Sequence, residues 1–163
     1  MDCLKFKENA QKWIQRALGD PITKILLKNS NLTKIQLETL LIDVLAENYA
    51  TKALNYDEKG RLRLTKAAVS RGSFNRTLNQ AKRNVKESIY TTLLLGYLGI
   101  TQSTSLTPYL EAANKLQTFT NTYRELATKN GDMDEQTKII NMLREELATI
   151  LEQLAEQKAS IDL

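Results

Sequence analysis

The sequence of 163 residues contains no histidine and only one cysteine, Cys3. Histidine is the commonest metal ligand and general base, so its absence excludes zinc fingers, HExxH metalloproteases and Ser-His-Asp hydrolases. A single cysteine cannot form a disulfide within the chain. The GxxxxGK[ST] and GxGxxG loops that bind nucleotide phosphates are missing as well. We therefore expect no enzymatic activity, no catalytic residue, no metal site and no cofactor.

Long apolar runs are also missing. The longest one, residues 93–100, is too short to span a bilayer, and the first ten residues lack the apolar stretch of a secretory signal. With only two prolines, six glycines and 42% hydrophobic residues, the composition is that of a chain able to bury a core. We expect a cytoplasmic protein with no membrane partner and no small-molecule substrate.

Acidic residues are absent from one stretch of the chain. Residues 59–86 carry nine basic side chains and no acidic one, although the net charge of the whole chain is only +4. The other residues hold 14 basic and 19 acidic side chains, so that part of the chain is negatively charged. This asymmetry indicates a segment that binds a polyanion, attached to a remainder with a different role.

Helical periodicity runs through most of the sequence. Apolar residues predict an amphipathic helix over residues 3–18 and a short one over 22–28. Thr33 and Gln36 form a capping box that predicts a helix from Lys34 to about residue 54. Residues 61–64 alternate between basic and apolar, which is typical of a short strand or an extended connector. The predicted core face of the third helix comprises Ile35, Leu37, Leu40, Leu41, Val44, Leu45 and Tyr49.

A long helix is predicted to begin after Ser70, which can cap it. One side forms an apolar stripe, and the opposite side is basic and rich in amides. Arginine can bind guanine and asparagine or glutamine can bind adenine with paired hydrogen bonds, so this face suits base recognition. A solvated basic face that binds an acidic protein is the alternative. The predicted stripe is Phe74, Leu78, Ala81, Val85 and Ile89; beyond Glu87 the helix is apolar on all sides, so we expect that end to be buried.

Residues 70–83, SRGSFNRTLNQAKR, resemble the recognition helix of helix-turn-helix DNA-binding proteins. The sequence is most similar to the recognition helices of sigma-factor region 4 and related regulators. The resemblance implies that the residues just after the turn face the major groove, with Arg83 and Lys86 near the DNA backbone. The groove-facing residues that it implies are Arg71, Ser73, Asn75, Arg76, Asn79 and Gln80.

The last third of the chain is predicted to form an antiparallel helical hairpin. Thr107 and Pro108 mark the start of its first helix, and the second begins at about Met133. The apolar stripe of the second helix is wider than one seam needs, so we expect this helix to join two copies in a homodimer. The alternative is a monomer whose hairpin folds back on its own domain. The residues predicted to mediate oligomerisation are Ile140, Leu143, Leu147, Ile150, Leu151 and Leu154.

Together these features predict an all-α protein with three parts. They are a helical arm over residues 1–30, a helix-turn-helix-like core over 31–104, and a dimerising hairpin or coiled coil over 105–163. The predicted function is binding of double-stranded DNA, as a transcription regulator or chromatin protein. An RNA-binding or scaffold subunit of a nucleoprotein complex and a helical protein-protein adaptor are the alternatives. The predicted nucleic-acid contacts are Arg61, Arg63, Lys66, Arg71, Ser73, Asn75, Arg76, Asn79, Gln80, Lys82, Arg83 and Lys86.

Overall fold

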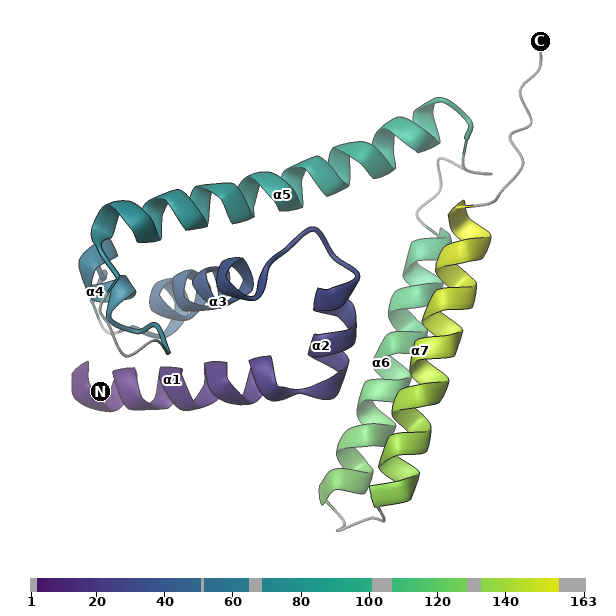
Figure 1. The fold of residues 1–163 in the computed structure, drawn as a ribbon, viewed down its shortest axis with the longest axis horizontal. Coiled ribbons are helices and arrows are strands. Elements are labelled where there is room, and N and C mark those ends of the chain that lie inside the picture. Colours follow the sequence, from purple (N-terminus) through teal and green to yellow (C-terminus); the bar gives the residue numbers. More distant parts are fainter. Residues whose placement is uncertain (1–2, 51, 65–68, 101–106, 129–132, 156–163) are drawn as a thin grey trace. The chain divides into compact units, whose positions relative to one another are not determined.

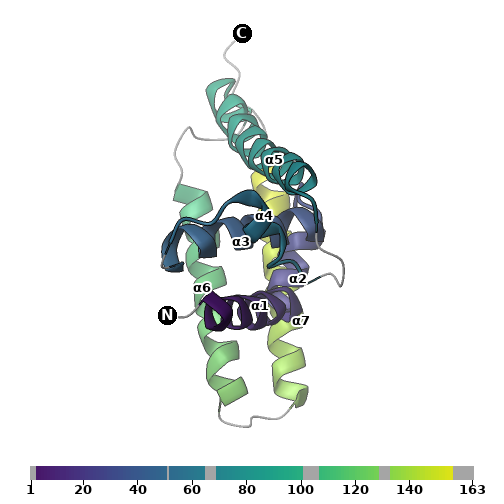
Figure 2. The same ribbon diagram turned by 90° about the vertical axis from the view of Figure 1, so that its left-hand side faces the viewer.

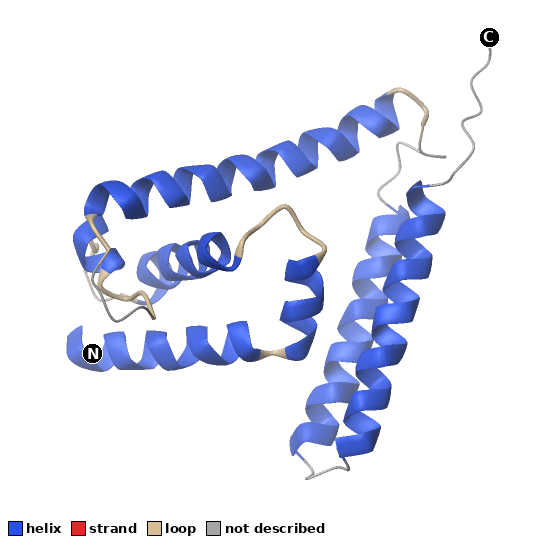
Figure 3. Cartoon of the chain, viewed as in Figure 1, coloured by secondary structure: helices blue, strands red, loops and turns tan. Residues whose placement is uncertain are grey.

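The computed structural model describes residues 3–50, 52–64, 69–100, 107–128 and 133–155. Within these ranges the secondary structure is helical and contains no strand, which confirms the all-α class (Figures 1 and 3). No helix in the same ranges is long and apolar enough to cross a membrane. The helices are α1 (Cys3–Gly19), α2 (Pro21–Lys28), α3 (Lys34–Tyr49), α4 (Tyr56–Gly60), α5 (Arg71–Tyr97), α6 (Thr107–Thr128) and α7 (Met133–Ala155).

The chain divides into two compact units, residues 1–88 and 89–163, and the boundary falls within α5. This division differs from the three parts expected from the sequence. Residues 1–30 do not form a separate arm, because α1 supplies part of the core that α3 and the first half of α5 complete. In this unit α3 lies between α1 and α5 (Figures 1 and 2).

The core of the first unit is built on one ridge of α1. Its buried members recur every four residues, which places them on one face of the helix. They pack with Ile42, Leu62, Phe74 and Leu78 from the other elements. Trp13, the neighbour of Ile14 on this helix, is 49% exposed. The α1 residues in the core are Phe6, Ala10, Ile14 and Leu18.

The start of α3 is the one predicted. The Gln36 backbone N–H donates to Thr33 Oγ1 at 3.2 Å, and the Thr33 backbone N–H donates to Gln36 Oε1 at 2.9 Å. The end and the buried face differ, because α3 ends at Tyr49 and buries polar side chains beside Ile42 and Ala46. Three predicted core residues are more than half exposed: Ile35, Val44 and Tyr49. The polar side chains buried in their place are Glu38, Thr39 and Asp43.

Residues 61–64 form neither a strand nor an extended connector. They continue from α4 as a turn, in which the Arg61 backbone N–H donates to Asp57 O at 3.2 Å and the Leu62 N–H donates to Lys59 O at 3.0 Å. The turn buries Leu62 and Arg63. Gly60 is required here, because a Cβ atom would lie 2.7 Å from the Val69 carbonyl oxygen.

Helix α5 begins directly after Ser70, as the sequence indicated. The Ser70 hydroxyl accepts a hydrogen bond from the Ser73 backbone N–H at 3.3 Å. At the other end Gly99 adopts a φ of 67°, and the N–H groups of Gly99 and Ile100 donate to Gly96 O and Leu95 O. This pattern is a Schellman motif, in which glycine avoids the strain of the left-handed conformation.

The predicted buried stripe of α5 is correct only in its first half. Phe74, Leu78 and Ala81 are at most 1% exposed, whereas Val85 is 41% and Ile89 is 56% exposed. The apolar side chains beyond Glu87, which we expected to be buried, are mostly exposed too. The buried stripe therefore ends at Ala81, before the boundary between the two units at residues 88 and 89.

In the second unit α6 and α7 pack along each other (Figure 1). Lys115 Nζ on α6 forms an ion pair with Glu146 Oε1 on α7 at 2.6 Å. Leu143 and Leu147 on α7 are buried, so they are not free to contact a second chain as the sequence suggested. Of the other positions predicted to mediate oligomerisation, Ile140 and Ile150 are half-buried, Leu151 is exposed, and the side chain of Leu154 lies outside the described part.

Candidate nucleic-acid interface

A buried acidic residue of α3 binds two cations of the predicted basic segment. Asp43 Oδ1 lies 2.6 Å from Lys59 Nζ, and its Oδ2 lies 2.7 Å from Lys82 Nζ. Burial raises the pKa of the Asp43 carboxyl, but the hydrogen bonds and charges of the two lysines outweigh it and leave this pKa below its usual value of 3.8. The hydrogen bond between Lys82 and Asp43 also raises the pKa of Lys82. Through these two ion pairs, Asp43 connects α3 to α4 and to α5.

A second acidic residue of α3 binds the turn after α4. Glu38 Oε2 lies 3.4 Å from Arg63 Nε, and Glu38 Oε1 accepts a hydrogen bond from the Leu64 backbone N–H at 2.6 Å. The Arg63 guanidinium also donates to Thr39 Oγ1. Arg63 is only 6% exposed, so it stabilises the fold and does not lie on the DNA-binding surface that the sequence suggested. Sequence reasoning missed Glu38 and Asp43 because their helix face looked polar and solvated.

The outer face of α5 has different surroundings. Arg76, Asn79, Arg83 and Lys86 follow one another at intervals of three and four residues and are all exposed. At about 100° per residue these positions fall on one side of the helix, opposite Phe74, Leu78 and Ala81. Among the described residues, Arg76, Arg83 and Lys86 form no ion pair. We call these four residues the outer face of α5.

A chain of amides holds α5 against the loop between α2 and α3. Gln80 Nε2 donates to Asn84 Oδ1 at 2.8 Å, and Asn84 Nδ2 donates to the Asn31 carbonyl at 2.7 Å. One turn further along, Asn31 Nδ2 donates to Ser88 Oγ at 3.0 Å. Asn84 had no assigned role in the sequence, where it is one amide among several. In the structure it fixes the rotation of α5, and with it the direction of the outer face.

An open groove runs beside the outer face. Its volume is about 350 Å³, and it separates the first turn of α3 from the second and third turns of α5. The lining is mostly hydroxyl and amide groups with one cation, and Ile35 gives it an apolar patch. Such a surface offers hydrogen-bond donors and a positive charge but no carboxylate. The lining residues are Thr33, Ile35, Gln36, Arg76, Thr77 and Gln80.

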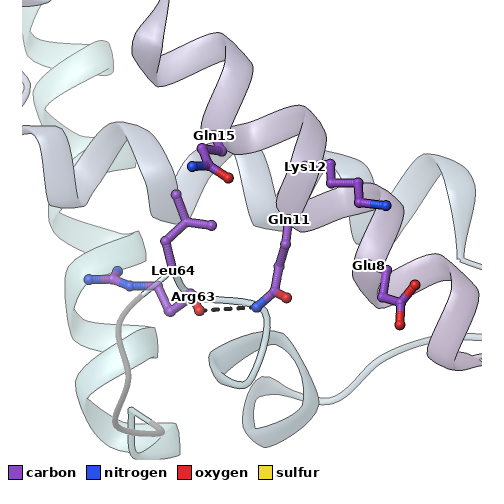
Figure 4. Close-up of a pocket in the computed structure, with 6 residues that line it drawn as sticks. All are labelled: Glu8, Gln11, Lys12, Gln15, Arg63 and Leu64. Carbon is purple, nitrogen blue, oxygen red and sulfur yellow. Dashed lines mark hydrogen bonds between the residues drawn. The ribbon is translucent and has the colours of Figure 1, made fainter.

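A second concavity, of about 300 Å³, lies between α1 and the turn after α4 (Figure 4). Gln11 closes one side of it by donating to the carbonyl oxygens of Leu62 and Arg63 at 3.4 and 3.3 Å. The guanidinium of Arg63 points away from Glu8 and Lys12 (Figure 4). The concavity is therefore lined by exposed polar side chains of both charges and offers no convergent site. No group of His, Cys, Asp or Glu side chains suited to a metal ion occurs among the described residues.

The structure thus sorts the predicted nucleic-acid contacts into five kinds. Arg63 is buried, Asn75 is half-buried, and Lys66 lies outside the described residues. Lys82 is exposed but bound to Asp43. The remaining ones are exposed: Arg61, Arg71, Ser73, Arg76, Asn79, Gln80, Arg83 and Lys86.

Comparison with known proteins adds nothing to this picture. No protein-family model matches the chain, and no curated protein or solved structure was found to match it.

Proposed function

We propose that the chain binds double-stranded DNA through the outer face of α5, as a transcription regulator or a chromatin protein. The observation that carries this proposal is the row Arg76, Asn79, Arg83 and Lys86, which is exposed and has no carboxylate partner among the described residues. A row of cations without nearby acids attracts a polyanion. The homodimer expected from the sequence belongs to the same proposal, since such proteins commonly bind paired half-sites.

The residue types of the outer face favour recognition of bases in addition to electrostatic attraction to the phosphates. A helix fits the major groove of B-DNA, where arginine can bind guanine and asparagine can bind adenine through two hydrogen bonds. Lysine mostly binds phosphates, which position the protein without selecting a sequence. Asn79 donates to Asn75 Oδ1 at 3.2 Å, so its side chain already has a defined orientation.

Duplex DNA explains the first half of α5 better than single-stranded RNA does. Proteins that recognise RNA sequence commonly stack bases on exposed aromatic rings. The only aromatic residue between Arg71 and Ser88 is Phe74, and its side chain is fully buried. The paired amide side chains of Gln80 and Asn84 also hold α5 rigidly against the α2–α3 loop. A rigid helix is the element that groove recognition needs.

The test is a titration of the full chain against a random-sequence duplex pool, followed by selection of the bound DNA. With Arg71, Arg76, Arg83 and Lys86 contacting phosphates or bases, log affinity should fall with log salt at a slope of roughly −4. We expect Asn79→Ala to relax the selected sequence and Lys86→Ala to weaken binding to every sequence about equally. Lys24→Ala, which removes an exposed lysine on α2, is the control for total charge.

The outcomes separate this function from its alternatives. Selection of a common motif supports recognition of duplex DNA. Tight binding without a preferred sequence would leave a chromatin protein, and tighter binding to single-stranded RNA would point to a nucleoprotein subunit. Absence of binding at low salt would contradict the proposal and leave a protein-protein adaptor.

A further inference from the structure

The end of α5 carries an unusual exposed surface. Ile89, Tyr90, Leu93, Leu94 and Tyr97 are between 56 and 84% exposed, and Leu98 and Ile100, just beyond the helix, are 52 and 38% exposed. Residues 88–110 contain no charged side chain. A helix that is apolar over much of its circumference is normally buried. We call the seven apolar side chains the apolar surface of α5.

The area of this surface is that of a protein interface. Taking a fully exposed Leu, Ile or Tyr side chain as about 200 Å², the apolar surface amounts to roughly 800 Å². The largest apolar patch of a typical monomer is about 300–600 Å², whereas one partner of a stable complex buries about 800 Å². The apolar surface therefore exceeds what a monomer commonly leaves exposed and matches one side of a standard interface.

The shape of the apolar surface suits a second helix of the same kind. Ile89, Leu93 and Tyr97 form one row at intervals of four residues, and Tyr90, Leu94 and Leu98 form the adjacent row. Two such rows enclose a groove into which a row of another helix can pack, with the axes crossing at about 50°. An identical helix presents the same rows and the same groove, so the surface is complementary to itself.

We propose that the apolar surface of α5 binds the apolar surface of a second copy of this chain, in a two-fold symmetric dimer. Two-fold pairing places identical segments opposite each other, which is unfavourable where they carry charge. Residues 88–110 carry none, so no like charges meet. Area, shape and absence of charge thus all fit a second copy.

The hairpin, which the sequence suggested as the dimer interface, fits this role less well. Leu143 and Leu147 are already buried, and the exposed apolar residues on α7 include Met142 and Leu151. Residues 132–163 carry eight acidic and three basic side chains. Pairing of two copies through α7 would therefore bring like charges together, unlike pairing through α5.

The test measures the mass of the full chain in solution without DNA, by sedimentation equilibrium and light scattering. We expect a dimer of twice 18.5 kDa. Leu94→Glu combined with Tyr97→Glu should raise the dimer dissociation constant at least about 30-fold, because central apolar contacts dominate such interfaces. Both positions are exposed, so the helix content measured by circular dichroism should not change. Met142→Glu with Leu151→Glu, at two exposed apolar positions of α7, is the matched control and should leave the dimer intact.

A cross-linking experiment keeps the proposal open to test if the charged variant fails to fold. Two-fold symmetry brings central residues of the two copies together, so Leu94→Cys in a Cys3→Ser chain should form a covalent dimer on oxidation. Met142→Cys in the same background should not.

Three results would overturn the proposal. One is a wild-type chain that stays monomeric at 100 µM, which would mean that the apolar surface is covered within its own chain or not at all. Another is a dimer lost through the α7 control. The third is binding of the monomer to neutral phosphatidylcholine vesicles that Leu94→Glu with Tyr97→Glu abolishes, because the occupant would then be a lipid surface. None of these measurements uses DNA, so the proposed function and this dimer can fail separately.

Discussion

The basic side chains of residues 59–86 fall into two groups with different surroundings. Lys59, Arg63 and Lys82 each contact a buried carboxylate of α3, whereas the basic residues of the outer face of α5 have no carboxylate partner among the described residues. The groups look alike in the sequence because the acids that bind one group and not the other lie 16 to 39 positions earlier in the chain. The positive charge of a segment therefore overstates the charge that a ligand can reach.

We call Lys59, Arg63 and Lys82 the inner group and the basic residues of the outer face the outer group. The largest expected effect comes from removing a carboxylate that binds the inner group. Asp43→Asn removes the charge that binds Lys59, whose side chain is only 9% exposed, and leaves this buried ammonium with the exposed Glu47 carboxylate as its only ion-pair partner among the described residues. Removal of one partner of a buried pair costs about 3–5 kcal/mol. We expect a loss near the lower end, about 3 kcal/mol, because Lys82 is half exposed and can be solvated. Urea denaturation followed by circular dichroism measures it.

Glu47→Gln is the matched control for this experiment. Glu47 lies 3.7 Å from the same Lys59 ammonium, but its side chain is 62% exposed. Exposed pairs contribute about 0–1 kcal/mol, so this change should be nearly neutral. Equal losses in Asp43→Asn and Glu47→Gln would show that burial does not distinguish the inner group.

The second effect concerns the outer group, whose removal should weaken DNA binding without lowering the stability of the fold. Replacing Arg76, Arg83 and Lys86 together with alanine should lower affinity for duplex DNA by about 30- to 100-fold at moderate salt and reduce the salt slope by about 3. These side chains are exposed and have no acidic partner among the described residues, so the free energy of unfolding should change by less than about 0.5 kcal/mol per residue. A large loss of stability with unchanged DNA binding would reverse the roles of the two groups.

The two groups also show how far the sequence could lead. Helix starts could be predicted from local chemistry, as at Thr33 and Gln36, because a capping box needs only four adjacent residues. The buried polar face of α3 could not. In the sequence Glu38 and Asp43 resemble solvent-exposed acids, because nothing shows that Arg63 and Lys59 lie opposite them. The positions of these two basic residues depend on α4 and the turn after it. The same turn made residues 61–64 look extended, since alternation of basic and apolar residues is also compatible with a turn that buries Leu62 and Arg63.

Burial along α5 was predicted correctly only where a partner is present. Periodicity says which side chains share a face, and Phe74 and Leu78 are indeed covered by α1 and α3. It does not say where the partner ends, so Val85 and Ile89 continue the stripe in the sequence but are exposed in the structure. For the candidate site, the exposed row of α5 could be predicted from its spacing. The role of Asn84 could not, because its partner, the Asn31 carbonyl, lies in a loop.

A pH titration gives the third and smaller effect, which depends on the ionisation of Asp43. Because its pKa is lowered on folding, the contribution of Asp43 to stability is present above the usual value of 3.8 and is lost as pH falls through the folded pKa. Protonated Asp43 then resembles asparagine, so the difference in stability between the wild type and Asp43→Asn should be constant above pH 5 and shrink toward pH 2. Denaturation curves of both proteins across this range measure it. A difference that stays constant to pH 2 would mean that the charge of Asp43 contributes nothing.

The smallest effect concerns Lys82, which belongs to the inner group by its partner and to the outer one by its exposure. Its side chain is 55% exposed, and its bond to Asp43 raises its pKa. Lys82→Gln should therefore cost at most about 1 kcal/mol, because Lys59 still neutralises Asp43 and exposed pairs are screened by solvent. Since the ammonium is bound to Asp43, the salt slope of DNA binding should change less than it does in Lys86→Ala. Denaturation and DNA titration of the two variants side by side would check this. If Lys82→Gln lowers the slope as much as Lys86→Ala while stability stays unchanged, then Lys82 contacts DNA in preference to Asp43, and pairing with a buried acid does not keep a cation from the ligand.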